Sequence, residues 1–205
     1  MVSGNAGRVS HEERKRRTRE ALTYAARGLF IAQGYGATTT DAIAKAAGVS
    51  RATFYLHFRS KAEIVLEQMR KAEPDILSDY RALATVPLEQ GALKDWLLGH
   101  AETWRRYRIE FSAIAQAMAA ESSVADEWFE SYGHIVAELP ELVARLVESG
   151  LEPRRANARL TALAMTIDRA FYFGIIGERP EFLATIIEEI AATMVFGLGS
   201  PLTIQ

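Results

Sequence analysis

The chain has 205 residues, of which 49% are hydrophobic and 24% are charged, and its formal net charge is −2. This composition is typical of a soluble globular protein, and no apolar run reaches the roughly 18 residues that predict a membrane span. The absence of cysteine excludes disulfide bonds, thiolate metal sites and cysteine nucleophiles. The opening MVSGNAGRVS lacks the apolar core of a signal peptide, so we expect a cytoplasmic protein without membrane association.

Charge is distributed unevenly along the chain. Residues 1–61 contain eleven Lys or Arg against four Asp or Glu, whereas the remainder contains 13 against 22. A basic segment joined to an acidic body predicts that the N-terminal part meets a polyanion. The run HEERKRRTRE, residues 11–20, has two interpretations, which are a solvated helix end and a set of phosphate contacts.

A helical pattern begins at His11, after about ten residues that we expect to be disordered. Apolar residues at three- and four-residue spacing, among them Leu22 and Phe30, continue the pattern to Gln33. Gly34 then predicts the end of this first helix.

The stretch from Thr38 to Lys61, TTTDAIAKAAGVSRATFYLHFRSK, predicts two short helices that meet at one glycine. Thr39 or Thr40 can cap the first of these helices. Gly48 supplies the left-handed turn position between them, and Ser50 caps the second helix.

The second short helix has a buried face and an exposed face. Phe54 and Phe58 lie four residues apart and share the buried face, whereas Ala52, Thr53 and Leu56 lie roughly opposite. A slim helix tip with polar side chains around it is suited to entry into the major groove of DNA.

The remainder of the chain predicts a helical bundle, and we found no strand pattern or internal repeat. Pro74 should bend or split the long helix that begins at Lys61. Further helices are expected over residues 87–107, 108–120, 122–148, and from Pro153 and Pro180 onward. The last two helices carry apolar stripes that predict pairing with the same helices of a second chain.

The segment from Arg16 to Lys61 resembles the DNA-binding domain of the TetR family of bacterial repressors, above all in TTTDAIAKAAGVSRATFYLHFRSK. The resemblance implies an all-α protein of about nine helices. It implies a helix-turn-helix DNA-binding domain at residues 11–61, with its recognition helix at about residues 50–57. A helical effector-binding and dimerisation domain would follow at residues 62–199.

Carried over position by position, the resemblance also implies DNA contacts. Thr40, Tyr55, His57 and Lys61 would contact phosphates, and Arg51 and Thr53 would contact bases or backbone. Ser50 would both cap the recognition helix and touch the backbone. The set of expected contacts is therefore Thr40, Ser50, Arg51, Ala52, Thr53, Tyr55, His57 and Lys61. Ala52 departs from the glycine of many family members, and its methyl group could meet a thymine methyl.

The body is rich in aromatic residues, which either fill the core or line a ligand cavity. The set, with two methionines, comprises Trp96, Trp104, Tyr107, Phe111, Met118, Trp128, Phe129, Tyr132, Met165, Phe171, Tyr172 and Phe173. As cavity walls we predict Trp104, Phe111, Trp128, Tyr132 and Tyr172. Asp168 and Arg169 interrupt an apolar helix, and we expect them to form an ion pair at the dimer seam rather than to contact the ligand.

Enzyme chemistry finds little support in the sequence. Glycine-rich phosphate loops, GxSxG and HExxH are absent, and the four histidines are scattered without metal-ligand spacing. We therefore predict neither an enzyme nor a metal or cofactor site.

The sequence thus predicts a homodimeric transcriptional regulator, a repressor that a small apolar or aromatic ligand releases from a palindromic operator on double-stranded DNA. One alternative is a ligand-independent architectural or activator protein whose body serves only dimerisation. A second is an enzyme or carrier with an accessory helical domain. The residues leave the operator, the effector and the sign of regulation open.

Overall fold

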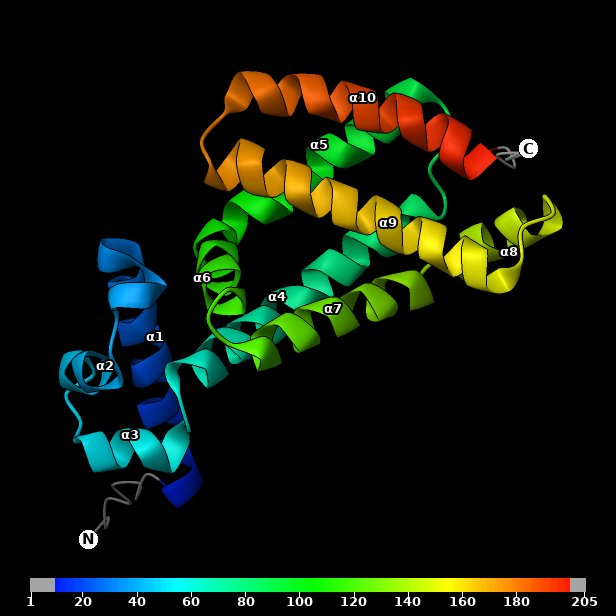
Figure 1. The fold of residues 1–205 in the computed structure, drawn as a ribbon. Coiled ribbons are helices and arrows are strands. Elements are labelled where there is room, and N and C mark those ends of the chain that lie inside the picture. Colours follow the sequence, from blue (N-terminus) through cyan, green and yellow to red (C-terminus); the bar gives the residue numbers. More distant parts are fainter. Residues whose placement is uncertain (1–9, 200–205) are drawn as a thin grey trace, which may run out of the picture. The chain divides into compact units, whose positions relative to one another are not determined.

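The computed structural model describes residues 10–199, and all its secondary structure within that range is helical. The described residues form ten α-helices and one π-helical turn, which confirms the predicted all-α class (Figure 1). The predicted disorder of the first residues concerns positions 1–9, which lie outside the described range. The chain divides into two compact units between Glu67 and Gln68. We call them unit 1 and unit 2.

Unit 1 consists of three helices and the start of a fourth. They are α1 (His11–Ala37), α2 (Thr40–Ala46), α3 (Arg51–His57) and α4 (Lys61–Leu83). Gly34 has φ 80° and ψ 164°, which interrupts the helical path of α1 at the position where the sequence predicts its end. Gly48 has φ 70° and makes the predicted left-handed turn between α2 and α3.

α4 continues from unit 1 into unit 2 as one helix, although it contains Pro74. Proline removes one backbone hydrogen bond from a helix interior and crowds the preceding turn. The prediction allowed a bend or a split at this position, and the structure shows that the helix is not split.

The other helices belong to unit 2. They are α5 (Gln90–Arg106), α6 (Arg108–Met118), α7 (Ser122–Ala137), α8 (Pro140–Glu148), α9 (Pro153–Phe171), the π-turn η1 (Tyr172–Ile176) and α10 (Pro180–Gly199). The prediction of one helix over residues 122–148 is wrong. Leu139 has the non-helical angles φ −120° and ψ 41°, and Pro140 opens a new helix because its missing N–H is not needed there. α5 begins at Gln90, three residues after the predicted start at Pro87.

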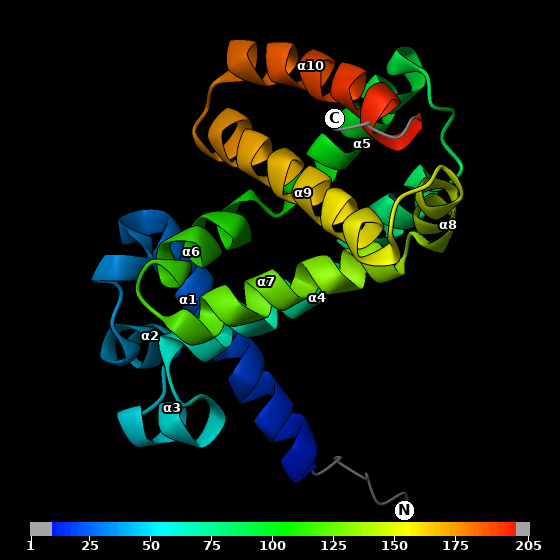
Figure 2. The same ribbon diagram turned by 45° about the vertical axis from the view of Figure 1, so that its right-hand side comes forward.

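Within unit 2, α9 lies between α10 on one side and α7 on the other, as both views show (Figures 1 and 2). α4 and α7 run side by side in the same direction. Two ion pairs fix their register, from Arg70 to Glu127 and from Arg81 to Glu138, each at 2.7 Å. α10 packs along α5 and α9.

Among the described residues, α10 is the one helix that is long and apolar enough to cross a membrane. This finding concerns length and composition only. The helix carries Glu188 and Glu189 near its middle, and Ile187, Ile190 and Met194 are buried against the rest of unit 2. One face of α10 is therefore packed against unit 2, and about a third of its apolar window is buried.

Candidate functional site

α3 is positioned by a cap at its start and by two aromatic rings beneath it. The Ser50 hydroxyl accepts a hydrogen bond from the backbone N–H of Thr53 at 3.0 Å, as predicted for a capping residue. Phe54 and Phe58 are buried, and their ring centroids lie 6.0 Å apart. Because these contacts fix the helix, its opposite face is held toward solvent.

The exposed part of α3 is tied to α2 by two polar contacts. Tyr55 Oη lies 3.2 Å from Thr40 Oγ1, and Arg51 Nη1 lies 2.8 Å from Asp41 Oδ2. Thr40, Arg51 and Tyr55, predicted from the sequence to contact DNA, therefore lie together on one surface. Ala52 is exposed beside Arg51.

Leu56 is 79% exposed, which is unusual for a large apolar side chain in a helix packed on its opposite side. We did not predict it as a contact, although its position opposite Phe54 is readable from helical spacing. Thr53 is half-buried, and its hydroxyl lies 2.8 Å from that of Ser50. These two residues are engaged with each other at the start of the helix.

His57 is turned partly inward. Its Nδ1 is buried and has no hydrogen-bond partner among the described residues. Burial lowers the pKa of its imidazole, and the nearby charges of Arg19 and Lys15 lower the pKa further. In the free protein these effects favour the neutral form of the ring, whereas a phosphate beside it would favour the charged form.

The structure gives the Lys61 ammonium a different place from the predicted phosphate contact. It donates hydrogen bonds to the carbonyl oxygens of Tyr35 at 2.7 Å and Thr38 at 2.8 Å. It also lies 4.1 Å from the ring centroid of Tyr35. The ammonium thus also has a structural role inside unit 1, and the predicted phosphate contact stays a prediction.

Arg19 was missed as a structural residue. Its guanidinium lies 4.0 Å from the ring centroid of Phe58 and donates to Glu67 Oε2 and to the carbonyl of His57, both at 2.5 Å. Arg19 lies three and seven residues before Leu22 and Ala26, which places it on the buried face of α1. Helical spacing in the sequence could therefore have predicted this position.

Arg16 and Arg17, near the start of α1, pair with acids of the same helix, and both interpretations of the run HEERKRRTRE remain open. Arg16 pairs with Glu13 at 2.9 Å and with Glu20 at 2.7 Å, and Arg17 pairs with Glu13 at 2.9 Å. These are exposed pairs within one helix, which contribute little to stability.

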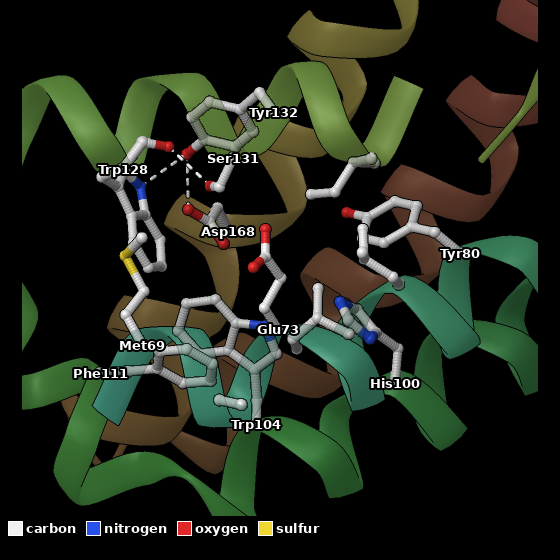
Figure 3. Close-up of a pocket in the computed structure, with 14 residues that line it drawn as sticks. Met69, Glu73, Tyr80, His100, Trp104, Phe111, Trp128, Ser131, Tyr132 and Asp168 are labelled. Atoms are coloured by element: carbon white, nitrogen blue, oxygen red, sulfur yellow. Dashed lines mark hydrogen bonds between the residues drawn. The ribbon is translucent and has the colours of Figure 1, made fainter. Parts of the chain in front are cut away.

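Unit 2 contains two adjoining cavities, of about 170 Å³ and about 40 Å³. All five predicted wall residues line the larger cavity, which is bounded by Trp104, Phe111, Ile114, Ala115, Met118, Trp128, Tyr132, Met165, Asp168, Arg169 and Tyr172. The smaller cavity (Figure 3) shares Trp104, Phe111, Trp128, Tyr132 and Asp168 with it. The shared side chains therefore stand between the two spaces.

The aromatic rings at this junction contact one another edge to face or at a tilt. The ring centroids of Trp104 and Phe111 lie 4.3 Å apart, those of Phe111 and Trp128 lie 6.0 Å apart, and those of Trp128 and Tyr132 lie 6.3 Å apart. Phe129 and Phe173 from the same predicted aromatic set are instead exposed.

A chain of hydrogen bonds runs through the junction (Figure 3). Trp128 Nε1 donates to the Tyr132 hydroxyl at 3.0 Å, and that hydroxyl donates to Asp168 Oδ2 at 2.6 Å. The predicted ion pair between Asp168 and Arg169 is wrong. Adjacent residues on a helix point in different directions, and the Arg169 guanidinium lies 5.5 Å from the ring centroid of Tyr172.

Burial raises the pKa of the Asp168 carboxyl to about 7, against lowering effects from the Tyr132 hydrogen bond and the Arg169 charge. Burial also raises the pKa of the Tyr132 hydroxyl, and the charge of Asp168 raises it further. The carboxyl lies deep in unit 2 and keeps some accessible surface because it borders both cavities.

Further polar groups that we did not predict line the smaller cavity. His100 is buried, and its Nδ1 lies 2.8 Å from Asp79 Oδ2. Glu73 lies on the same wall, and its Oε1 is 2.5 Å from His134 Nδ1. Tyr80 is buried, and burial raises the pKa of its hydroxyl. Within the described part of the chain, no group of three or more acidic or histidine side chains is placed to hold a metal ion.

The geometry of unit 1 defines a class of protein. A capped helix that follows a glycine turn and exposes a short tip is the arrangement of a helix-turn-helix DNA-binding protein.

Comparison with known proteins identifies the family. The family model described as "Bacterial regulatory proteins, tetR family" matches residues 22–67. The HTH-type transcriptional repressor KstR2 of Rhodococcus jostii is 32% identical over 152 residues, which cover 74% of this chain and 69% of the relative. The chain belongs to the TetR family.

Two further relatives show the range of similarity. The HTH-type transcriptional activator FasR of Mycolicibacterium smegmatis is 29% identical over 180 residues, covering 81% of this chain and 74% of the relative. The solved structure of GusR from Salmonella enterica superposes with a TM-score of 0.61 at 21% identity, covering 92% of this chain and 99% of that one. The chain is a transcriptional regulator and not an enzyme.

Proposed function

We propose that this regulator is a homodimeric repressor that binds a palindromic operator and leaves it when a small molecule occupies the unit 2 cavities. The observation that carries the proposal is the exposed surface formed by Thr40, Arg51 and Tyr55 at the start of α2 and α3. In a dimer, two copies of α3 would enter successive major grooves about 34–36 Å apart.

Two features of unit 1 support DNA as the partner. Residues 1–61 carry a net charge of +7 although the whole chain carries −2. The side chains at the tip of α3 are short or planar, which suits contact with base edges, and hydroxyl groups surround them. The contacts we propose are Thr40, Ser50, Arg51, Ala52, Thr53, Tyr55 and His57, together with Leu56.

The outer surface of α9 and α10 supports a homodimer. Met165, Phe173, Phe182 and Phe196 are 41%, 39%, 41% and 70% exposed, although all four are large and apolar. A groove between the two helices is lined by several of these side chains. Exposed apolar patches of this kind mark interaction sites, and pairing of the same surface in two chains would bury them.

The two cavities support a small-molecule effector. Their walls are mainly aromatic, with a few polar groups, as ligand sites in proteins usually are. We place DNA binding in residues 11–61 and effector binding and dimerisation in residues 62–199. α4 crosses the boundary between the two compact units, and we propose that ligand binding acts on DNA through this helix.

We propose that the protein represses rather than activates transcription. KstR2 is named a repressor and FasR an activator, so relatives of similar identity differ in this respect. Release by a ligand requires that operator and ligand oppose each other, and each then weakens the other by the same factor. We place the protein in the cytoplasm, where its DNA partner lies.

The alternative is a DNA-binding protein whose body has no effector. One observation favours it, since the larger cavity of about 170 Å³ is below the roughly 300 Å³ at which ligand pockets usually begin. A ligand that fits without rearrangement must therefore be small.

Selection of bound fragments from a random pool of DNA duplexes tests the proposal. We expect enrichment of an inverted repeat whose half-sites are separated by about one helical turn. Tyr55→Ala should abolish enrichment, whereas Tyr24→Ala, at a tyrosine that is 81% exposed on α1, should not. Enrichment of a single asymmetric site, or of no site, would contradict the proposed operator.

A further inference from the structure

The carboxyl group of Asp168 is the acid at the junction of the two cavities (Figure 3). Oδ2 accepts a hydrogen bond from the Tyr132 hydroxyl, which is a neutral donor. No basic side chain in the described range forms an ion pair with Asp168. The charge of Arg169 lowers the pKa of this carboxyl without an ion pair, so a cation placed directly against the buried carboxylate would stabilise it further.

The neighbouring basic residue, Arg169, borders the larger cavity but forms no ion pair with Asp168. The guanidinium of Arg169 lies over the rings of Tyr172 and Phe173, 5.5 Å and 5.9 Å from their centroids, and its side chain is exposed. Glu73 adds a second carboxylate to the wall of the smaller cavity. Asp168 and Glu73 therefore make the smaller cavity unfavourable for an anion, whereas the larger cavity is bordered by Arg169 as well as by Asp168.

The walls around Asp168 are aromatic faces and edges from three helices. Trp104 comes from α5, Phe111 from α6, and Trp128 and Tyr132 from α7. A cation near such rings is attracted by their negative faces, most strongly where water is excluded. The carboxylate and the rings thus favour the same kind of ligand.

We propose that the two cavities form one binding site for a small aromatic amine in its cationic form. This inference rests on the proposed function only in treating the cavities as a ligand site. The ammonium group would lie against Asp168 and the ring among Trp104, Phe111 and Trp128. The larger cavity, at about 170 Å³, resembles in size an engineered protein cavity of roughly 150 Å³ that holds benzene. A ligand with one aromatic ring therefore fits without rearrangement.

Ionisation of Asp168 would link binding to pH. Burial raises the pKa of this carboxyl to about 7, and a bound cation would lower it. Binding of the amine should therefore release protons near neutral pH and strengthen between pH 6 and pH 8. The titratable and charged groups around the carboxyl are Glu73, Asp79 and Tyr80 on α4, His100 on α5, Tyr132 and His134 on α7, and Arg169 on α9.

Three probes of similar size and different charge test the proposal on the full-length protein. Benzylamine is cationic, benzyl alcohol is neutral and benzoate is anionic at pH 8. We expect benzylamine to bind about tenfold more tightly than benzyl alcohol, and benzoate to bind more weakly than either. Calorimetry and quenching of tryptophan fluorescence measure the three affinities. Equal binding of the amine and the alcohol, or preference for benzoate, would overturn the inference.

Variants assign any preference to Asp168. Asp168→Asn should remove the preference for the amine while leaving benzyl alcohol binding within about twofold, because the space is retained. Asp95→Asn, at an exposed position on α5, should change neither affinity. Retained binding of benzyl alcohol by Asp168→Asn guards against a general loss of packing in this variant. An unchanged preference in Asp168→Asn would refute the role of this carboxylate.

The outcome for DNA is measured separately. If benzylamine binds through Asp168 and leaves operator affinity unchanged, the site stands and the proposed effector mechanism fails. If only neutral or anionic compounds bind the cavities and release DNA, the effector mechanism stands and the cation site fails.

Discussion

The ammonium nitrogen of Lys61 lies 2.7 Å from the carbonyl oxygen of Tyr35, in a partly buried position within unit 1. This hydrogen bond joins the start of α4 to the segment that ends α1. The ammonium also donates a hydrogen bond to the carbonyl oxygen of Thr38. Lys61 therefore stabilises the segment from Tyr35 to Thr38, which leads into α2.

Replacement of Lys61 by methionine should therefore destabilise unit 1. The substitution leaves two carbonyl oxygens without their charged donor, which should lower the free energy of unfolding by about 1–3 kcal/mol. Lys45→Met, at an exposed position on α2, should change it by less than about 0.5 kcal/mol. Hydrogen exchange of the amides of α1, α2 and α3 measures the effect in this unit. Equal protection in the two variants would contradict the structural role of Lys61.

Tyr55→Phe should weaken operator binding without unfolding the protein. The phenol oxygen lies 3.2 Å from Thr40 Oγ1 at an exposed position, so it can bond to a phosphate while the ring stays in place. Loss of one such hydrogen bond should reduce affinity by about tenfold. Fluorescence anisotropy with the selected duplex measures this change, and Tyr24→Phe on α1 serves as the control. If Tyr24→Phe reduced operator affinity as much as Tyr55→Phe, the loss of affinity would not be due to a contact between Tyr55 and DNA.

The pair formed by Arg51 and Asp41 predicts opposite effects of two substitutions. Arg51→Ala should weaken DNA binding, whereas Asp41→Asn should strengthen it, because the guanidinium is then free and one negative charge is removed. If Arg51 contacts a phosphate, Arg51→Ala should also make the plot of log association constant against log salt concentration less steep, by about 0.9. DNA affinity measured at several salt concentrations tests the predicted changes in affinity and in salt dependence. Weaker binding by Asp41→Asn would show that the pair itself is needed for DNA contact.

Asp168→Asn should stabilise the protein at neutral and alkaline pH. The folded-state pKa of about 7 lies above the ordinary value of 3.8, so the wild-type protein loses stability as pH rises through this window. Asparagine does not titrate, and its advantage should grow by up to about 3 kcal/mol between pH 5 and pH 8. Urea unfolding at the two pH values, followed by tryptophan fluorescence, measures the difference. An advantage that does not change with pH would mean that the carboxyl is not buried as described, and Asp95→Asn should show no such trend.

The sequence was sufficient where local rules decide the structure. The cap at Ser50, the turn at Gly48 and the aromatic pair Phe54 and Phe58 follow from spacing and residue type alone, and all three are present. The break before Pro140 was missed because proline is tolerated both inside a kinked helix and at the start of a new one.

Long-range contacts were not accessible in the same way. The structural contacts of Lys61, expected as a phosphate contact, and of Arg19, in the basic run of α1, were not predicted because their partners lie 26 and 38 residues away in the chain. The five aromatic wall residues were grouped by composition, and the structure brings them to one cavity. Asp168 was interpreted from its neighbour Arg169, whereas its partner is Tyr132 on another helix.

α9 presents Asp168 to the cavities and Thr166 to the outer groove, while Met165 and Arg169 border both spaces. The wall between the interior site and the outer surface is therefore a single helix, about 10 Å across with its side chains. A ligand that displaces this wall alters the shape of the outer groove directly, without any intermediate layer. The cavity and the outer groove of unit 2 therefore share α9 as a common wall.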